Sequence, residues 1–282
     1  MKDPFRRDVH LLSELESIEA WRGKIVDYTI SEYIIPRLNK KQSFTQQEVI
    51  DFARKVTRAR YDFAKEQKYK DENLKKTEHE FDYAALYHFE YNSSKDINGK
   101  LKSAWGEIEL ALNNFLANKE LISYLKTAKY LITQRNIKFS LNGTTIQGVP
   151  DLIAFFTETP PHIVDWKVHY FGTKSYNEQL MVYALALLSC NPHKDFPADL
   201  NKYTVPEINL TEYQLLKNTV RNYNVTDDQF EVLRDDLADG IYLMEKRKCN
   251  EDYKNLNIDD FEKTRNLDNC NNCSFKRLCF EG

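Results

Sequence analysis

Two carboxylates and one ammonium group stand close enough in the sequence to act together. Asp151 follows Gly148-Val-Pro, and Asp165 and Lys167 flank Trp166 a little further along the chain. A hard cation such as Mg²⁺ takes oxygen ligands and keeps several waters, so two carboxylates and the backbone carbonyl of Trp166 would supply half of an octahedron. A neighbouring lysine could orient a metal-bound water and stabilise charge on a phosphate. These residue types predict hydrolysis of a phosphodiester.

The sequence around these residues predicts a series of strands. Residues 130–141 alternate between apolar and polar, Asn142-Gly143 favours a hairpin turn, and 144–156 would form the partner strand. A second turn over 157–161 leads into a strand over 162–168. Because successive side chains of a strand point to opposite faces, Asp165 and Lys167 should project together. We expect Asp151, on the preceding strand, to face them.

An amphipathic helix is predicted over residues 175–188, directly after the last of these strands. Gln179 and Tyr183 are one turn apart on it, so both could face the carboxylates and the lysine. The alternatives are that Tyr183 packs in the core and that Gln179 lies on the helix surface.

The remaining elements are mostly helical. We expect helices between residues 9 and 75, with a capping box at Thr45 to Glu48, and an irregular segment over 91–100. A helix over 101–125 should break near Asn118. A hairpin over 208–216 and 219–225 precedes a last long helix, which opens at a second capping box, Thr226 to Gln229.

Length and composition are those of a globular protein. The 282 residues suit one large domain, or a core domain with a smaller helical one. The formal net charge is −3, so any contact with nucleic acid must come from a local basic patch. The N-terminus lacks the apolar run of a signal peptide, and the apolar stretch over 180–190 is too short to span a bilayer. We expect a cytoplasmic protein that does not contact membranes.

Three segments together resemble a known family: Gly148-Val-Pro-Asp151, Ile163-Val-Asp165-Trp-Lys167 and Gln179-Leu-Met-Val-Tyr183. They look like the motifs of the PD-(D/E)XK nuclease superfamily, and most closely of its RecB-like branch, which includes helicase–nuclease subunits and CRISPR-adaptation nucleases. The resemblance covers residues 101–282 and leaves 1–100 as an N-terminal helical region. It implies an α/β, restriction-endonuclease-like core, in which a mixed central sheet is flanked by helices.

The resemblance also assigns roles to residues. It implies that Asp151 and Asp165 bind Mg²⁺ or Mn²⁺, that Lys167 is the catalytic lysine, and that Gln179 and Tyr183 belong to the same catalytic site. The implied reaction is cleavage of DNA.

The upstream part of the family pattern is incomplete in this chain. RecB-like nucleases often carry a further metal-binding histidine, which follows a glycine on a helix before the first strand. Here Gly106 is followed by Glu107 and Glu109 but by no histidine. Either glutamate could replace it as a metal ligand, or both could be ordinary helix-surface residues. Many relatives also carry a glutamate in the strand before the hairpin, near where Gln134 stands, and an amide would be a weaker ligand.

Five cysteines are present, and the last three are closely spaced: Cys190, Cys249, Cys270, Cys273 and Cys279. This distribution predicts a metal site rather than a secreted disulfide framework. The C-x₂-C-x₅-C ending resembles half of the iron–sulfur staple of some RecB-like nucleases. A [4Fe–4S] cluster would need Cys249 or Cys190 as its fourth ligand, and Zn²⁺, with Cys249 or a histidine, is the competing metal. Cys190 also suits a buried position in the core, and the cluster could be lost, which would leave free thiols.

The sequence therefore predicts a metal-dependent nuclease that hydrolyses DNA, in repair and recombination, CRISPR adaptation or phage defence. The alternatives are a catalytically inactive subunit that binds DNA or acts as a scaffold, and a ribonuclease. The chain has no G-x₄-G-K-[ST] motif, so any unwinding motor would be a separate helicase. Its other expected partner is a CRISPR or defence protein.

Overall fold

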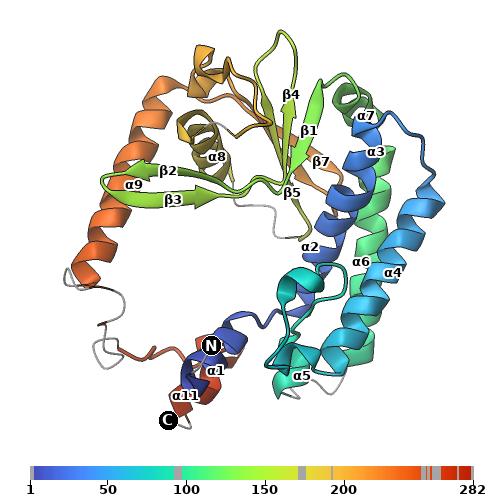
Figure 1. The fold of residues 1–282 in the computed structure, drawn as a ribbon, viewed down its shortest axis with the longest axis vertical. Helices are drawn as coiled ribbons and strands as arrows, with labels where there is room; N and C mark the ends of the chain where they lie inside the picture. Colours follow the sequence, from blue (N-terminus) through green and yellow to red (C-terminus); the bar gives the residue numbers. More distant parts are fainter. Residues whose placement is uncertain are drawn as a thin grey trace. The chain divides into compact units, whose positions relative to one another are not determined.

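A computed structural model describes residues 3–91, 97–170, 176–191, 193–248, 252, 255, 262–271 and 273–280. The α-helices are α1 (Pro4–Ser13), α2 (Ile18–Thr29), α3 (Ile35–Asn39), α4 (Gln46–Lys65), α5 (Tyr87–Tyr91), α6 (Ile97–Ala117), α7 (Lys119–Leu125), α8 (Asn177–Ser189), α9 (Asp227–Arg247), α10 (Asp268–Asn271) and α11 (Lys276–Phe280) (Figure 1). A π-helical segment, η1 (Ile30–Ile34), joins α2 to α3. The strands are β1 (Tyr130–Thr133), β2 (Ile137–Leu141), β3 (Thr144–Gly148), β4 (Leu152–Phe155), β5 (His162–Lys167), β6 (Asn209–Gln214) and β7 (Thr219–Tyr223).

The chain forms two compact units, each assembled from separate segments of sequence. The first unit comprises residues 1–22, 54–105 and 250–282, and the second comprises 23–53 and 106–249. The boundary expected at residue 100 falls inside α6, and both units contain residues from each side of it. The second unit holds all the strands found among the described residues.

The second unit is built on a mixed five-stranded sheet in the order β1-β4-β5-β6-β7. Only the β5–β6 pair is parallel. Helix α8 covers one face, where Ile163, Leu180 and Leu210 belong to one buried core. The other face carries Trp166 and Tyr213, whose rings both pack against Phe115 of α6. Helices on both faces of a mixed sheet confirm the predicted fold class.

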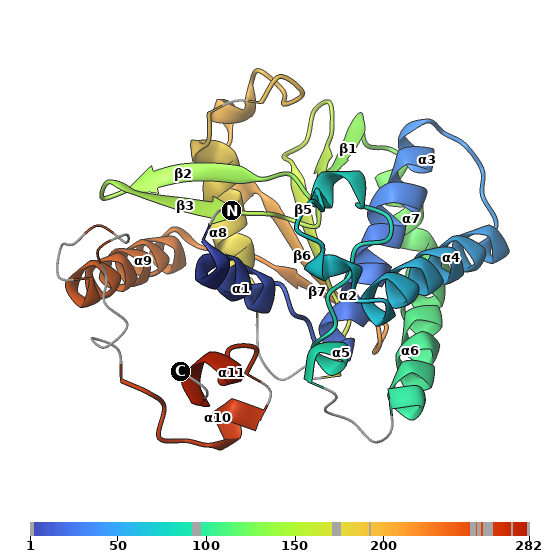
Figure 2. The same ribbon diagram turned by 60° about the horizontal axis from the view of Figure 1, so that its bottom comes forward.

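The long hairpin expected over residues 130–156 is divided in the structure. Gln134 has a φ of +50°, in the left-handed region, and the chain leaves the sheet after β1. Strands β2 and β3 then pair only with each other, around the predicted turn at Asn142 and Gly143. Figure 2 shows this two-stranded ribbon beside α8, separate from the main sheet. The chain rejoins the sheet as β4, so Asp151 directly precedes this strand.

Both predicted capping boxes are present. The Thr45 hydroxyl accepts from the Glu48 N–H at 3.2 Å, while the Glu48 carboxylate accepts from the Thr45 N–H at 2.7 Å. Thr226 and Gln229 make the same reciprocal pair at the start of α9. The break expected near Asn118 is also confirmed, because Asn118 ends α6 and caps α7. Within the segment expected to be irregular, 92–96 lie outside the described residues and α6 begins at Ile97.

The first unit has a small core of its own. Its buried residues include Leu12 of α1, Phe63 of α4 and Ala85, which lies shortly before α5. Leu278 of the C-terminal helix α11 packs against them. Within the described part of the chain, no helix is long and apolar enough to cross a membrane.

Candidate active site

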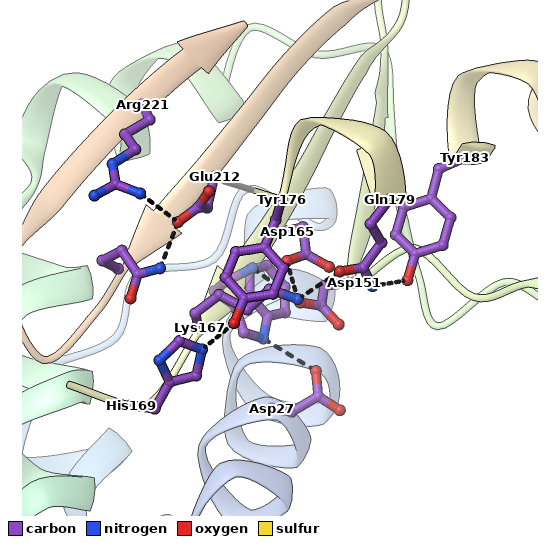
Figure 3. A network of polar contacts seen from close by, with 12 residues as sticks. Asp27, Asp151, Asp165, Lys167, His169, Tyr176, Gln179, Tyr183, Glu212 and Arg221 are labelled. Atoms are coloured by element: carbon purple, nitrogen blue, oxygen red, sulfur yellow. Dashed lines mark hydrogen bonds and ion pairs between the residues drawn. The ribbon is translucent and has the colours of Figure 1, made fainter. Parts of the chain in front are cut away.

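The Lys167 ammonium is the centre of a continuous set of polar contacts at the end of β5. Its Nζ atom lies 2.6 Å from Asp165 Oδ2 and donates to Gln179 Oε1 at 2.9 Å. The Gln179 amide in turn donates to the Tyr183 hydroxyl at 2.5 Å. Figure 3 shows the strand residues and the helix residues pointing toward one another. The structure therefore brings together four of the five predicted catalytic residues by direct contact.

Strand and helix geometry explain this convergence. Asp165 and Lys167 share a face of β5 because they are two residues apart, and α8 crosses that face. Gln179 and Tyr183 are one helical turn apart on α8, so both can reach the end of the strand. The Lys167 ammonium also stands 4.7 Å from the centre of the Tyr176 ring, a cation–π contact.

The Tyr183 ring occupies the space that a side chain at Gly148 would take. A Cβ atom built on Gly148 would lie 2.8 Å from Cδ1 of Tyr183 and 3.1 Å from Cε1. The glycine of the Gly148-Val-Pro-Asp151 segment is therefore needed for close packing against α8. Tyr183 is buried, as core packing requires, and its hydroxyl contacts Gln179. Its catalytic role stays a prediction.

Asp151, the fifth predicted residue, is held beside Trp166. Its Oδ2 accepts from the Trp166 backbone N–H at 2.9 Å, and its Oδ1 accepts from the Gln134 amide at 3.2 Å. Gln134 lies near the position at which the resemblance implies a glutamate. Here its NH₂ group donates to the Asp151 carboxylate. The predicted role of the Trp166 carbonyl as a metal ligand stays a prediction.

A third carboxylate, Asp27 of α2, completes this part of the site, and the sequence reasoning missed it. Its Oδ1 accepts from the Trp166 indole N–H at 3.1 Å and from the same Gln134 amide at 2.8 Å. Asp27 stands four residues after Gly23 on a helix before the first strand. A glycine followed by an acid on a helix before the first strand is the sequence signal for this residue. Gly23 with Asp27 fits that signal, as Gly106 with Glu107 or Glu109 does.

The carboxylates perturb one another. Burial raises the pKa of Asp151 well above its ordinary value, and the charges of Asp165 and Asp27 raise it further. Burial likewise raises the pKa of Asp165, with Lys167 opposing the shift and Glu212 adding to it. The pKa of Tyr183 rises to about 12, mainly through burial. Grouped acids with raised pKa values are typical of sites that perform chemistry or bind a cation.

A comparison with models of protein families identifies the chain. The model described as the PD-(D/E)XK nuclease superfamily matches residues 7–280. The chain belongs to the PD-(D/E)XK nuclease superfamily. No curated protein sequence matches this PD-(D/E)XK chain. Among solved structures, it is similar to the one titled "Crystal structure of SSO0001", with 15% identity, 69% of this chain and 79% of that chain covered, and a TM-score of 0.30. That likeness is too weak to support an argument.

The donor set of this PD-(D/E)XK site fits a hard divalent cation. Mg²⁺ is usually bound by one or two carboxylates, with waters and substrate oxygens filling its other positions. Asp151 and Asp165 supply that number. Burial, and to a lesser extent neighbouring carboxylates, raises the pKa of both, and a bound cation would stabilise their charged forms. Among the described residues, no three His, Cys, Asp or Glu side chains form a ready metal group, so protein ligands alone would not enclose the ion.

The sequence predicts two further sets of metal ligands. Glu107 and Glu109 are half-buried on α6, and their role as ligands stays a prediction. Cys270 and Cys273 are half-buried and Cys279 is exposed, and with the other described residues they make no group of three ligands. The tentative fourth ligand, Cys249, lies outside the described residues. Cys190 is half-buried at the end of α8, and its thiol contacts the Leu187 carbonyl.

Proposed function

We propose that this member of the superfamily is a RecB-like nuclease that hydrolyses DNA phosphodiester bonds with Mg²⁺ or Mn²⁺. The observation that carries the proposal is the position of Lys167 Nζ, between a carboxylate oxygen of Asp165 at 2.6 Å and the amide oxygen of Gln179 at 2.9 Å. Two acceptors hold the ammonium in one place, and preorganised charge of this kind is what stabilises a developing phosphoryl charge.

Each residue has a distinct part in the proposed reaction. Asp151 and Asp165 would hold the cation, which supplies a polarised phosphoryl oxygen and a water of lowered pKa when bound. Lys167 would orient the attacking water and face the charge that develops on the phosphate. Gln179 fixes the direction of the ammonium and is itself held by the Tyr183 hydroxyl. Asp27 would act through Trp166 and Gln134 on the position and charge of Asp151.

The decisive experiment compares labelled single-stranded DNA, duplex DNA and RNA, each with Mg²⁺, Mn²⁺ or EDTA. We expect cleavage of at least one DNA substrate that requires the metal. Asp165→Asn and Lys167→Gln should each lower the cleavage rate by about 100-fold or more, in line with the loss of a preorganised charge. Asp235→Asn and Lys138→Gln are matched controls, because both side chains are exposed, on α9 and β2.

Three outcomes would contradict the proposal in different ways. DNA binding with no cleavage under any metal would indicate an inactive binding or scaffold subunit. Cleavage confined to RNA would indicate a ribonuclease. Undiminished cleavage by both site variants would remove the assigned residues from the reaction.

We also propose that Cys270, Cys273 and Cys279 bind a [4Fe–4S] cluster or Zn²⁺, with Cys249 as the fourth ligand. Support comes from the C-x₂-C-x₅-C spacing and the thiolate chemistry of such sites. Elemental analysis of the purified protein, together with its visible absorbance, distinguishes iron from zinc. Absence of both metals from protein purified without oxygen would refute the assignment. A separate helicase, or a CRISPR or defence protein, is the proposed partner of the chain.

A further inference from the structure

A polar row of side chains continues from the candidate active site across two more strands. Asp165 of β5 is paired with Glu212 of β6, and Glu212 is paired with Arg221 of β7. Residues paired directly across strands share a face of the sheet, so Arg221 lies on the same face as Asp165. Figure 3 shows Glu212 between the two. The proposed hydrolysis uses neither Glu212 nor Arg221.

Glu212 is a fully buried carboxylate with several donors around it. Its Oε2 accepts from the Tyr223 hydroxyl at 2.6 Å, and its Oε1 accepts from the Gln214 amide. Arg221 Nη1 adds a contact of 3.4 Å to Oε1. A carboxylate buried this deeply is held rigidly by such contacts, so it provides a fixed anchor for the guanidinium.

The Arg221 side chain reaches solvent from this anchor. It is 34% exposed, whereas Glu212 is 0% exposed. A guanidinium carries five N–H donors in a planar fork, a geometry well suited to an oxyanion. The exposed part of the Arg221 side chain can therefore meet an outside oxyanion while the contact with Glu212 is kept.

The spacing of the row fits a nucleic-acid backbone. Neighbouring strands lie about 4.8 Å apart, so two spacings place the backbone of Arg221 about 10 Å from that of Asp165. Each strand of a duplex carries one phosphate per roughly 3.4 Å of helix axis. A strand that follows this row from Asp165 would pass Arg221 within about three nucleotides of the scissile phosphate.

We propose that Arg221 binds a non-scissile phosphate of the DNA strand held in the active site, and that Glu212 is the positioning residue that orients it. The inference rests on the proposed nuclease function and adds a phosphate subsite to it. The subsite would fix the register of the strand on the sheet.

The test measures binding and cleavage separately on the full chain. Binding of a labelled oligonucleotide is measured in the Asp165→Asn background as a function of salt, and cleavage is measured in the unmodified background. We expect Arg221→Gln to raise Kd roughly tenfold, as expected for the loss of a charged hydrogen bond. The slope of log Kd against log salt should fall by somewhat less than one, the change for one phosphate contact. Arg234→Gln, an exposed arginine of α9, is the matched control and should change neither.

Two further measurements separate phosphate binding from a structural role. Arg221→Lys keeps a point charge and should recover part of the affinity and the salt slope. Replacing one phosphate at a time by a neutral methylphosphonate should identify a single position, within three nucleotides of the cut, at which unmodified protein loses affinity. At that position Arg221→Gln should cause no further loss. Glu212→Gln, which keeps the guanidinium but weakens its anchor, should give an intermediate Kd.

An ordinary structural ion pair predicts different results. Arg221→Gln would then lower Tm while Kd and the salt slope stayed unchanged, and no methylphosphonate position would be singled out. That result, with cleavage by the unmodified protein intact, overturns the phosphate subsite and leaves the proposed function standing. If Arg221→Gln does not fold, the methylphosphonate scan on the unmodified protein and Arg221→Lys still decide the question.

Discussion

Tyr183 packs the edge of its ring against the backbone of Gly148, where a Cβ atom would stand 2.8 Å from Cδ1. This contact joins two motifs that are separate in the sequence, the strand before Asp151 and the helix that carries Gln179. The Tyr183 hydroxyl is the acceptor that holds Gln179, and Gln179 holds Lys167. The position of the Lys167 ammonium therefore depends on the absence of a side chain at residue 148.

Gly148→Ala should accordingly damage the site more than the fold. The new methyl group forces the Tyr183 ring to move, at a cost of about 1–3 kcal/mol in the free energy of unfolding. Cleavage should fall further than this loss explains, because Gln179 loses its acceptor. Denaturant unfolding and single-turnover cleavage measure the two effects.

Gly240→Ala is the control for this substitution, because a Cβ atom there meets nothing within 4 Å. In the middle of α9 it should leave cleavage unchanged and stabilise the protein by roughly 0.5–1 kcal/mol. Gly148→Ala with Tyr183→Leu should recover stability but not activity. If Gly148→Ala by itself changed neither stability nor cleavage, the packing of the Tyr183 ring would not require a glycine at this position.

Asp27→Asn tests whether Asp27 is the acidic residue, on a helix before the first strand, that contributes to the metal site. Removing this charge should raise the Mn²⁺ concentration for half-maximal cleavage about 10- to 100-fold, as is typical of groups that orient metal ligands. The pKa of Asp151 should also fall, because the charge of Asp27 contributes to raising it. The acid limb of the pH profile of kcat/KM should therefore move to lower pH.

Glu107→Gln and Glu109→Gln provide the comparison for Asp27→Asn. If Asp27 is the upstream acid, both glutamine variants should keep the metal requirement of the unmodified protein. A large rise in the Mn²⁺ requirement of either variant, with none for Asp27→Asn, would show that a glutamate of α6 contributes to the metal site instead of Asp27.

His162 should make the protein less stable in acid. Burial lowers its pKa from 6.5 to about 4, and its Nε2 lies 2.7 Å from the Thr211 hydroxyl. Above about pH 6.5 the imidazole is neutral in both folded and unfolded chains. Between pH 6.5 and 4 only the unfolded chain takes up the proton. The free energy of unfolding should therefore decrease by up to roughly 3 kcal/mol as the pH is lowered through this range.

Unfolding midpoints in urea between pH 4 and 7.5 test this expectation. His162→Gln should show a shallower loss of stability over that range, while His10→Gln, at an exposed position, should behave as the unmodified protein does. Parallel curves for the unmodified protein and His162→Gln would contradict a lowered pKa.

Arg277 should hold the C-terminal segment of the first unit in place. Its guanidinium pairs with Asp8 of α1 and, at 3.0 Å, with Glu90 of α5, whose side chain is only 3% exposed. Arg277→Met should cost about 1–2 kcal/mol, since Lys70 still pairs with Glu90. Limited proteolysis should then cut the C-terminal segment faster.

Arg265→Met is the matched control for the C-terminal prediction. The Arg265 side chain is 93% exposed and its only described ion pair, with Glu262, spans 3.8 Å, so its loss should change neither stability nor proteolysis. Equal proteolysis of the Arg277→Met variant and the unmodified protein would show that the ion pairs do not hold the segment.

Local sequence patterns predicted the parts of the site that lie close together along the chain. Alternation on β5 places Asp165 and Lys167 on one face, and helical spacing on α8 does the same for Gln179 and Tyr183. The capping boxes and the Asn142-Gly143 turn were likewise readable, because each depends on backbone conformation within a few residues. The hairpin prediction failed at Gln134, where tertiary contacts hold a non-glycine residue at positive φ.

By itself, the sequence determined which residues are candidates for chemistry: the two aspartates, the lysine, and the strand and helix that carry them. Only the tertiary structure brought Asp27 to Trp166, placed Tyr183 on Gly148, and aligned Asp165 with Glu212 and Arg221. The physical reason is that periodicity encodes which face of an element a side chain occupies. It does not encode which distant element packs against that face, because that choice is made by the whole core at once.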